Sequence, residues 1–132
     1  MAAEAHSRGL GIGLKNSQDI LYQVSGDIQF AVNEECAVYN ECGFYADFTS
    51  PKVPGVVPKP VFHIEYIQFQ GTQIVADAAR FQTYNVDQLR KTLCLQEPGQ
   101  PNYGLSSVIA TQNLDAWTME CDGGRVYTTF IL

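Results

Sequence analysis

Residues 60–66 read PVFHIEY, a short and mostly apolar run. Similar apolar runs occupy residues 10–15, 28–33 and 105–110, and helical patterns or loops rich in Gly and Pro separate them. Strands that are buried on both faces read as nearly continuous apolar runs, and helices that alternate with such strands cover a parallel sheet. The sequence therefore predicts an α/β fold with four parallel strands, arranged in space in the order of the chain.

The segments between these runs carry their own local signals. Residues 1–8 resemble the tail of a helix that Gly9 ends, and Ser17 is a suitable N-cap for a helix over residues 18–24. Three prolines mark residues 50–59 as a surface loop. Further expectations are a short helical or irregular stretch at 45–48, a helix over 72–81, a helix or turn over 86–93, a loop at 96–103 and a turn at Gly123-Gly124.

The composition restricts the class of protein and its partners. The 132 residues suffice for one domain, and 45% hydrophobic with 17% charged residues does not suit a disordered chain. The net charge of −6 opposes binding to nucleic acid or to an anionic membrane, and it tolerates a cationic ligand. No apolar run approaches the length of a membrane helix, and residues 1–8 do not form a signal peptide.

The chain has four cysteines, Cys36, Cys42, Cys94 and Cys121. An even number permits two disulfides, and the alternative is four buried free thiols. The sequence has no Cys-x-x-Cys motif, and both histidines are isolated from the cysteines along the chain. We therefore expect no zinc site and no cofactor.

Several short stretches of the sequence form an ordered set along the chain. They are AHSRGL at 5–10, GLKN at 13–16, FAVNEEC at 30–36, YNEC at 39–42, KPVFHIEY at 59–66 and a looser set from Ser106 through Trp117 to Cys121. In this order they resemble glycoside hydrolase family 114, the endo-α-1,4-polygalactosaminidase-like group. The resemblance implies a (β/α)8 TIM barrel, of which residues 1–132 supply roughly strands five to eight, the C-terminal half of the domain.

The sequence departs from the family pattern in three respects. The resemblance implies that the first four strand–helix units are absent, and with them the strand end that carries the family's other catalytic carboxylate. Glu35 stands where the family more often has glutamine, and the loop at 50–58 is longer than expected.

In barrels of this type, active-site groups follow the C-terminal ends of the strands. The resemblance implies that Glu34 is the acid/base of a glycosidase, which needs two carboxyl groups across one bond. A carboxyl at the end of a buried strand is also expected to be partly desolvated, which would raise its pKa. The alternative is that Glu34 merely begins a solvated loop.

Other polar residues at strand ends are expected to bind the substrate. They are Lys15, Asn16, Asn33, Glu65 and Tyr66. Glu65 could instead orient Glu34 or form a salt bridge at the barrel rim, Lys15 could pair with either glutamate, and Tyr66 could be a packing aromatic. His63 should share the barrel-facing side of Glu65 on one strand, and we expect a hydrogen-bonded interior histidine rather than a catalytic one.

Two disulfides suit this arrangement. A bridge between Cys36 and Cys42 would hold the loop beside Glu34, and one between Cys94 and Cys121 would join the segments before and after the last strand, although the sequence leaves other pairings open. Such bridges and the family resemblance favour an extracellular protein.

The resulting hypothesis is hydrolysis of O-glycosidic bonds in an α-1,4-galactosamine-containing polysaccharide, with nucleic acid and membrane excluded as partners. The alternative is an inactive fragment or a carbohydrate-binding remnant that lacks the partner carboxylate, so the sequence leaves enzymatic activity open. Because both edges of a four-stranded sheet would be open, we also expect a tendency to self-associate.

Overall fold

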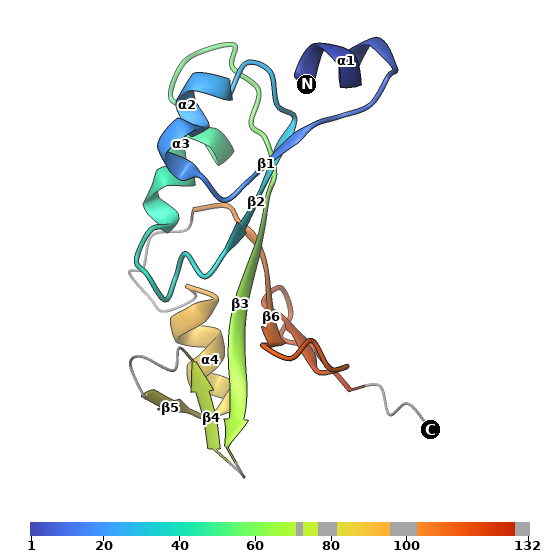
Figure 1. Cartoon of the computed structure of the whole chain (residues 1–132). Helices are drawn as coiled ribbons and strands as arrows, with labels where there is room; N and C mark the ends of the chain where they lie inside the picture. Colours follow the sequence, from blue (N-terminus) through green and yellow to red (C-terminus); the bar gives the residue numbers. More distant parts are fainter. Residues whose placement is uncertain (71–72, 77–81, 96–102, 129–132) are drawn as a thin grey trace.

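A computed structural model describes residues 1–70, 73–76, 82–95 and 103–128 of the chain. Its centre is a sheet in which four strands lie side by side in chain order and run parallel (Figure 1). These strands are β1 (Gly13–Lys15), β2 (Phe30–Glu34), β3 (Val61–Gln70) and β6 (Ser106–Thr111). The predicted α/β class and the predicted parallel order are confirmed, and the arrangement is that of part of a (β/α)8 barrel.

Short helices occupy most of the segments predicted to be helical. They are α1 (Ala2–Ser7), η1 (Gln18–Ile20), α2 (Leu21–Val24), η2 (Cys42–Tyr45), α3 (Ala46–Thr49) and α4 (Val86–Leu93). Gly9, with φ of 71°, follows α1 in the left-handed region that glycine adopts without strain. Asn85 and Gln88 form a reciprocal capping box that begins α4. No helix of the described residues is long and apolar enough to span a membrane.

The two faces of the parallel sheet differ in their cover. Figure 1 shows α2, α3 and α4 on the same side of the strands. On this side, Ala31 of β2 and Val61 of β3 are completely buried against Leu21 of α2 and Phe48 of α3. On the opposite face Phe62 is 48% exposed. Because successive strand residues point to opposite faces, the position of a residue along its strand decides whether helices cover it.

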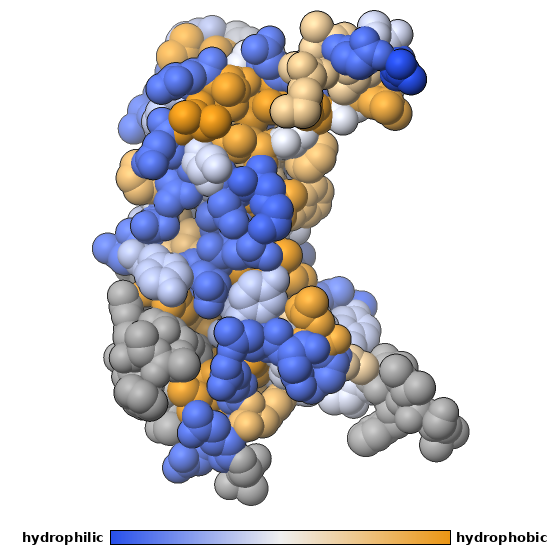
Figure 2. All heavy atoms as spheres, in the orientation of Figure 1, coloured by the Kyte–Doolittle hydropathy of each residue, from blue (hydrophilic) through white to orange (hydrophobic). Residues whose placement is uncertain are grey.

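A second cluster of buried residues lies under α4. It joins Leu89 and Leu93 of this helix to Ile67 of β3 and Ile109 of β6. The cluster that contains Leu21 and Phe48 lies under an apolar surface. Figure 2 shows hydrophobic side chains gathered over the end of the molecule that carries α2 and α3. Here the loop at 50–59 forms neither helix nor strand, as predicted, and contributes exposed valines.

The predicted helix over 72–81 is wrong where the structure describes this segment. Residues 73–76 form strand β4 (Gln73–Ala76), which pairs antiparallel with an extended β3 and with β5 (Gln82–Tyr84). The physical reason is the partner: β3 continues to Gln70 and offers a free edge, and the adjacent β-branched residues Ile74 and Val75 suit a strand better than a helix. Residues 71–72 and 77–81 lie outside the described part of the chain.

The prediction that both sheet edges are open is wrong for one edge. Beyond β6 the chain adds β7 (Thr118–Glu120) and β8 (Val126–Tyr127), both antiparallel. The predicted turn at Gly123-Gly124 returns the chain between them, with φ of 78° and 65°. Among the described strands, β1 pairs with β2 alone and keeps its other edge free. The predicted loop at 96–103 lies outside the described residues except for Tyr103.

Both predicted disulfides are present. Cys36 bonds to Cys42 with Cα atoms 4.8 Å apart, and Cys94 bonds to Cys121 with Cα atoms 5.4 Å apart. The first closes the short loop that follows β2. The second joins the residue after α4 to the residue after β7, so that it ties the helix layer to the antiparallel edge of the sheet.

Candidate active site

Glu34, the last residue of β2, lies at the centre of a small polar cluster. Its Oε2 accepts hydrogen bonds from Lys15 Nζ at 2.5 Å and from Asn16 Nδ2 at 3.2 Å. Its Oε1 accepts a hydrogen bond from Tyr66 Oη at 2.9 Å. Lys15 ends β1 and Tyr66 belongs to β3, so the two neighbours of β2 supply donors from both sides.

The strand register explains why these side chains meet. Lys15 pairs with Val32, and Glu34 pairs with Ile64. Paired residues of parallel strands share a face, and so do residues two apart on one strand. Lys15, Glu34 and Tyr66 therefore project from the same face of the sheet, the one that the helices leave uncovered.

Asn16 fixes the backbone beside Glu34. Its Oδ1 accepts the Glu34 N–H at 2.9 Å, and its own N–H donates to the carbonyl of Val32 at 2.7 Å. Asn16 and Ser17 have φ of 51° and 53°, a left-handed turn immediately after β1. Asparagine adopts this conformation more readily than most residues, which suits it to a sharp turn at the site.

The electrostatics of Glu34 differ from the expectation. Hydrogen bonding by Lys15, followed by that of Tyr66, lowers the pKa of Glu34, and burial opposes this only in part. The predicted rise of the pKa is therefore wrong: the strand end supplies three donors to the carboxylate and leaves the side chain 27% exposed. Burial and then the hydrogen bond to Glu34 raise the pKa of Tyr66, which keeps its proton for donation.

This arrangement has a definite chemical capacity. As the structure stands, Glu34 is an ionised carboxylate that can accept a proton or stabilise a positive charge. It can donate a proton only after it has gained one, and the hydrogen bond from Lys15 opposes that gain.

Two of the predicted binding residues lie elsewhere. Asn33 and Glu65 point to the helix-covered face and are 2% and 0% exposed. Asn33 Nδ2 donates to Tyr45 Oη at 3.1 Å. The structure therefore brings Lys15, Asn16 and Tyr66 to Glu34, and it places Asn33 and Glu65 on the opposite, helix-covered face of the sheet.

Glu65 is part of a buried hydrogen-bond network. Its Oε1 lies 2.6 Å from His63 Nε2 and accepts the backbone N–H of Ala37 at 2.7 Å. His63 Nδ1 lies 2.8 Å from Ser107 Oγ. The expectation of a hydrogen-bonded His63 on the side of Glu65 is confirmed, but this side faces the helices, so the expectation that it faces the inside of the barrel is wrong. Sequence reasoning missed Ser107 and Ala37, because the register that pairs His63 with Ser107 is not visible along the chain.

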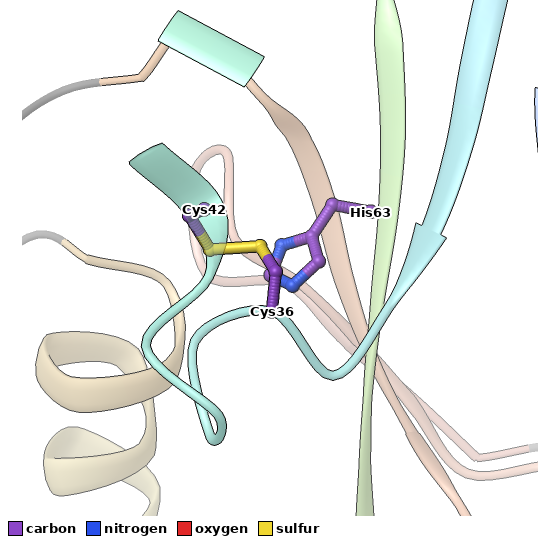
Figure 3. Close-up of side chains that lie close together, drawn as sticks. All are labelled: Cys36, Cys42 and His63. Atoms are coloured by element: carbon purple, nitrogen blue, oxygen red, sulfur yellow. A yellow bond between two sulfur atoms is a disulfide. The ribbon is translucent and has the colours of Figure 1, made fainter. Parts of the chain in front are cut away.

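The same histidine lies beside a disulfide. Figure 3 shows the imidazole of His63 next to the bond between Cys36 and Cys42, and potential ligand atoms of the three residues lie within 4.8 Å of one another. The two sulfurs are bonded to each other, and both ring nitrogens have hydrogen-bond partners. The disulfide form of this group therefore offers no thiolate to a metal ion.

Comparisons with known proteins agree with this architecture. The profile of Glycoside-hydrolase family GH114 matches residues 1–126. The crystal structure of Aspergillus fumigatus Ega3 in complex with galactosamine is similar, with a TM-score of 0.61 and 35% sequence identity. The match covers 91% of this chain and 41% of that chain, so this chain spans less than half the length of that structure. No curated protein matches the chain significantly.

Proposed function

Because the chain belongs to glycoside hydrolase family GH114, we propose that it carries the Glu34 side of an active site that hydrolyses a galactosamine-containing α-1,4-linked polysaccharide. The observation that carries the proposal is the Glu34 carboxylate, held by Lys15, Asn16 and Tyr66 at the C-terminal ends of parallel strands. This is the edge at which barrels of this kind build their active sites.

In this proposal Glu34 acts as the acid/base. A glycosidase places two carboxyl groups on either side of the scissile bond, and one of them protonates the leaving oxygen. Loss of the Lys15 hydrogen bond on substrate binding would raise the pKa of Glu34 toward its ordinary value of 4.5, and burial of the carboxyl by the bound substrate would have to raise it further before it holds that proton. In its ionised form Glu34 would then activate water as a base.

Lys15, Asn16 and Tyr66 are the proposed substrate contacts. An ammonium, an amide and a phenol can all donate to sugar hydroxyls, and all three lie on the uncovered face of the sheet. Asn33 and Glu65 are proposed to act from the helix-covered face of the sheet, where they hold the segment that carries Glu34. The net charge of −6 favours a polymer that bears amines.

The setting is proposed to be extracellular. Two disulfides pair all four cysteines, and structural disulfides persist in oxidising compartments.

A second candidate function is binding without cleavage. It is favoured by one observation: the chain matches only 41% of the length of the similar Ega3 structure, and a glycosidase needs two carboxyl groups across the scissile bond. The partner carboxylate would then have to come from a further part of the barrel. Without it, the same cluster would hold the polysaccharide and leave the bond intact.

The test is the release of reducing ends from α-1,4-linked galactosamine polysaccharide. We expect none from the 132-residue chain alone and clear release from a longer chain that completes the barrel. In the longer chain, Glu34→Gln should abolish release, while the matched variant Glu4→Gln, on exposed α1, should retain it. Full activity of Glu34→Gln would remove Glu34 from the mechanism, and a completed barrel that binds the polymer without releasing ends would favour the binding function.

A further inference from the structure

A polar hollow lies beyond Tyr66, between the end of β3 and the loop that follows β6. Its volume is about 410 Å³, and it is lined by Gln68, Phe69, Thr111, Gln112, Asn113 and Asp115. We infer that this cavity is a subsite for a sugar unit with a free amine, and that the Asp115 carboxylate recognises the ammonium group. The inference rests on the proposed function, because it assigns a second sugar contact to the same substrate.

The position of the cavity follows from the register. Ile64 lies beside Glu34, Tyr66 is two residues further along β3, and Gln68 is two residues beyond Tyr66. Residues two apart share a face, so Gln68 continues the face of Glu34 by about 7 Å past Tyr66. Gln112 extends the neighbouring strand, and its N–H donates to the Ile67 carbonyl at 2.8 Å. Thr111 pairs with Ile67 and belongs to the opposite face, so the cavity lies across the end of the sheet, and a polymer directed along β3 from Glu34 would reach it at Gln68 and Gln112.

The charge in the cavity is fixed in place. Asp115 Oδ1 accepts the Thr111 hydroxyl at 2.6 Å and the Trp117 N–H at 3.1 Å. These hydrogen bonds, with that of Thr111 the strongest, lower the pKa of Asp115, so the carboxylate is anionic over the neutral range. The donors are neutral, and the ion pairs formed among the described residues do not include Asp115. The negative charge is therefore left for a cationic ligand.

The other lining groups suit a sugar ring. The side chains of Gln68, Gln112 and Asn113 offer amide donors and acceptors for hydroxyl groups. The Phe69 ring is 46% exposed and is held edge-on against Trp117, with ring centroids 5.5 Å apart. An aromatic face, a few amides and one carboxylate form a typical combination for orienting a small polar ligand. The carboxylate distinguishes the free amine from its neutral N-acetylated form.

The experiment is a titration of the isotopically labelled chain followed by NMR. Galactosamine and N-acetylgalactosamine are the two probes, which share the ring and differ in charge. The backbone amide signals of Asn113 and Trp117 report on the cavity, and those of Asn16 and Glu34 report on the proposed catalytic cluster. We expect galactosamine to shift the first pair of signals at lower concentration than N-acetylgalactosamine does.

Asp115→Asn should weaken binding of galactosamine at the cavity by roughly tenfold and remove its advantage over the acetylated sugar. Asp27→Asn is the matched control, because Asp27 is exposed ahead of β2, at the opposite end of the strands, and should change nothing. The comparison of the two sugars on the unmodified chain needs no variant, so a misfolded Asp115→Asn leaves the test intact.

The site-resolved signals separate the two proposals. Shifts at Asn16 and Glu34 without shifts at Asn113 and Trp117 would overturn the subsite and leave the proposed function standing. Shifts at Asn113 and Trp117 alone would support the subsite and count against the proposed function. Equal response to both sugars at the cavity, or no response there, would overturn the assignment of Asp115.

Discussion

Lys15 Nζ lies 2.5 Å from Glu34 Oε2, across the boundary between the ends of β1 and β2. The pair joins two strands that share an uncovered face, and the lysine is the largest cause of the lowered pKa of Glu34. The ammonium group therefore contributes most to the lowered pKa of the candidate acid/base. If the substrate displaces it, the pKa of the carboxyl rises, and a larger fraction of Glu34 carries the proton that the leaving oxygen needs.

Replacement of Lys15 tests this relationship. In Lys15→Met the pKa of Glu34 should rise toward its ordinary value of 4.5, because the charged donor is lost and the aliphatic stem is kept. The measurement is a pH titration of the Glu34 side-chain carboxyl carbon by NMR. Lys52→Met is the matched control, since Lys52 pairs with Asp47 at 3.4 Å and does not contact Glu34. An unchanged pKa in Lys15→Met would contradict the assignment.

The same pair predicts how stability depends on pH. The folded chain holds the pKa of Glu34 below its value in the unfolded chain, so the carboxylate stabilises the fold above the unfolded pKa. This contribution is lost as the pH falls through the folded pKa. Urea unfolding at a series of pH values below about 5 should therefore show a smaller acid loss in Lys15→Met than in the unmodified chain. An equal or steeper loss in the variant would speak against the pair.

Removal of the Tyr66 hydroxyl should have a weaker effect of the same sign. Tyr66→Phe keeps the ring and deletes the donor to Glu34 Oε1, which should cost about 1 kcal/mol of unfolding free energy. The pKa of Glu34 should rise less than in Lys15→Met, because the lysine hydrogen bond is the larger cause. Tyr22→Phe is the control, since Tyr22 is 59% exposed. A larger rise in Tyr66→Phe than in Lys15→Met would reverse this ranking.

These sites show what the sequence could and could not predict. The order of the parallel strands followed from four apolar runs, and the meeting of Lys15, Asn16 and Tyr66 with Glu34 followed from the rule that polar residues at strand ends gather at one edge of the sheet. The face of the sheet to which each of these side chains points was not predictable in the same way. Glu34 and Glu65 are both at that edge, but the register pairs Glu34 with Ile64, so Glu65 points to the opposite face.

The strand β4 shows a different limit. Ile74 and Val75 fit a helical spacing when they are read alone, but the long edge of β3 lies beside them and pairs Phe69 with Ile74. A tertiary partner of this kind overrides local preference. The expectation of a raised pKa for Glu34 was wrong for a related reason. The hydrogen-bond donors that lower this pKa come from the neighbouring strands.

The buried Glu65 gives a stability prediction. Glu65→Ala would leave the Ala37 N–H and His63 without their carboxylate partner, which should cost about 3 kcal/mol because both groups are enclosed. Glu65→Gln keeps the size and one acceptor oxygen, and it should cost less. The measurement is urea unfolding, with Glu4→Ala as the control on exposed α1. Equal stability of Glu65→Ala and Glu4→Ala would show that the network contributes little.

The two disulfides should differ in what their loss affects. Cys94 and Cys121 are 27 residues apart, and Cys36 and Cys42 are 6 apart. The chain-entropy estimate gives about 3.5 kcal/mol for the longer loop and about 2 kcal/mol for the shorter one, since the longer loop restricts the unfolded chain more. Replacing Cys94 and Cys121 together by alanine should therefore lower the free energy of unfolding more than replacing Cys36 and Cys42.

Binding at the Glu34 cluster should follow the opposite order. The bridge between Cys36 and Cys42 closes the loop directly after Glu34, and the Ala37 N–H that Glu65 holds lies inside it. Loss of this bridge should broaden or shift the amide signals of Asn16 and Glu34 and weaken saccharide binding there, while loss of the other bridge should leave these signals in place. Urea unfolding and NMR measurements on each of the two double variants show which bridge holds the Glu34 site. If loss of the bridge between Cys94 and Cys121 disturbs the Glu34 signals as strongly, the short bridge has no special part in holding the site.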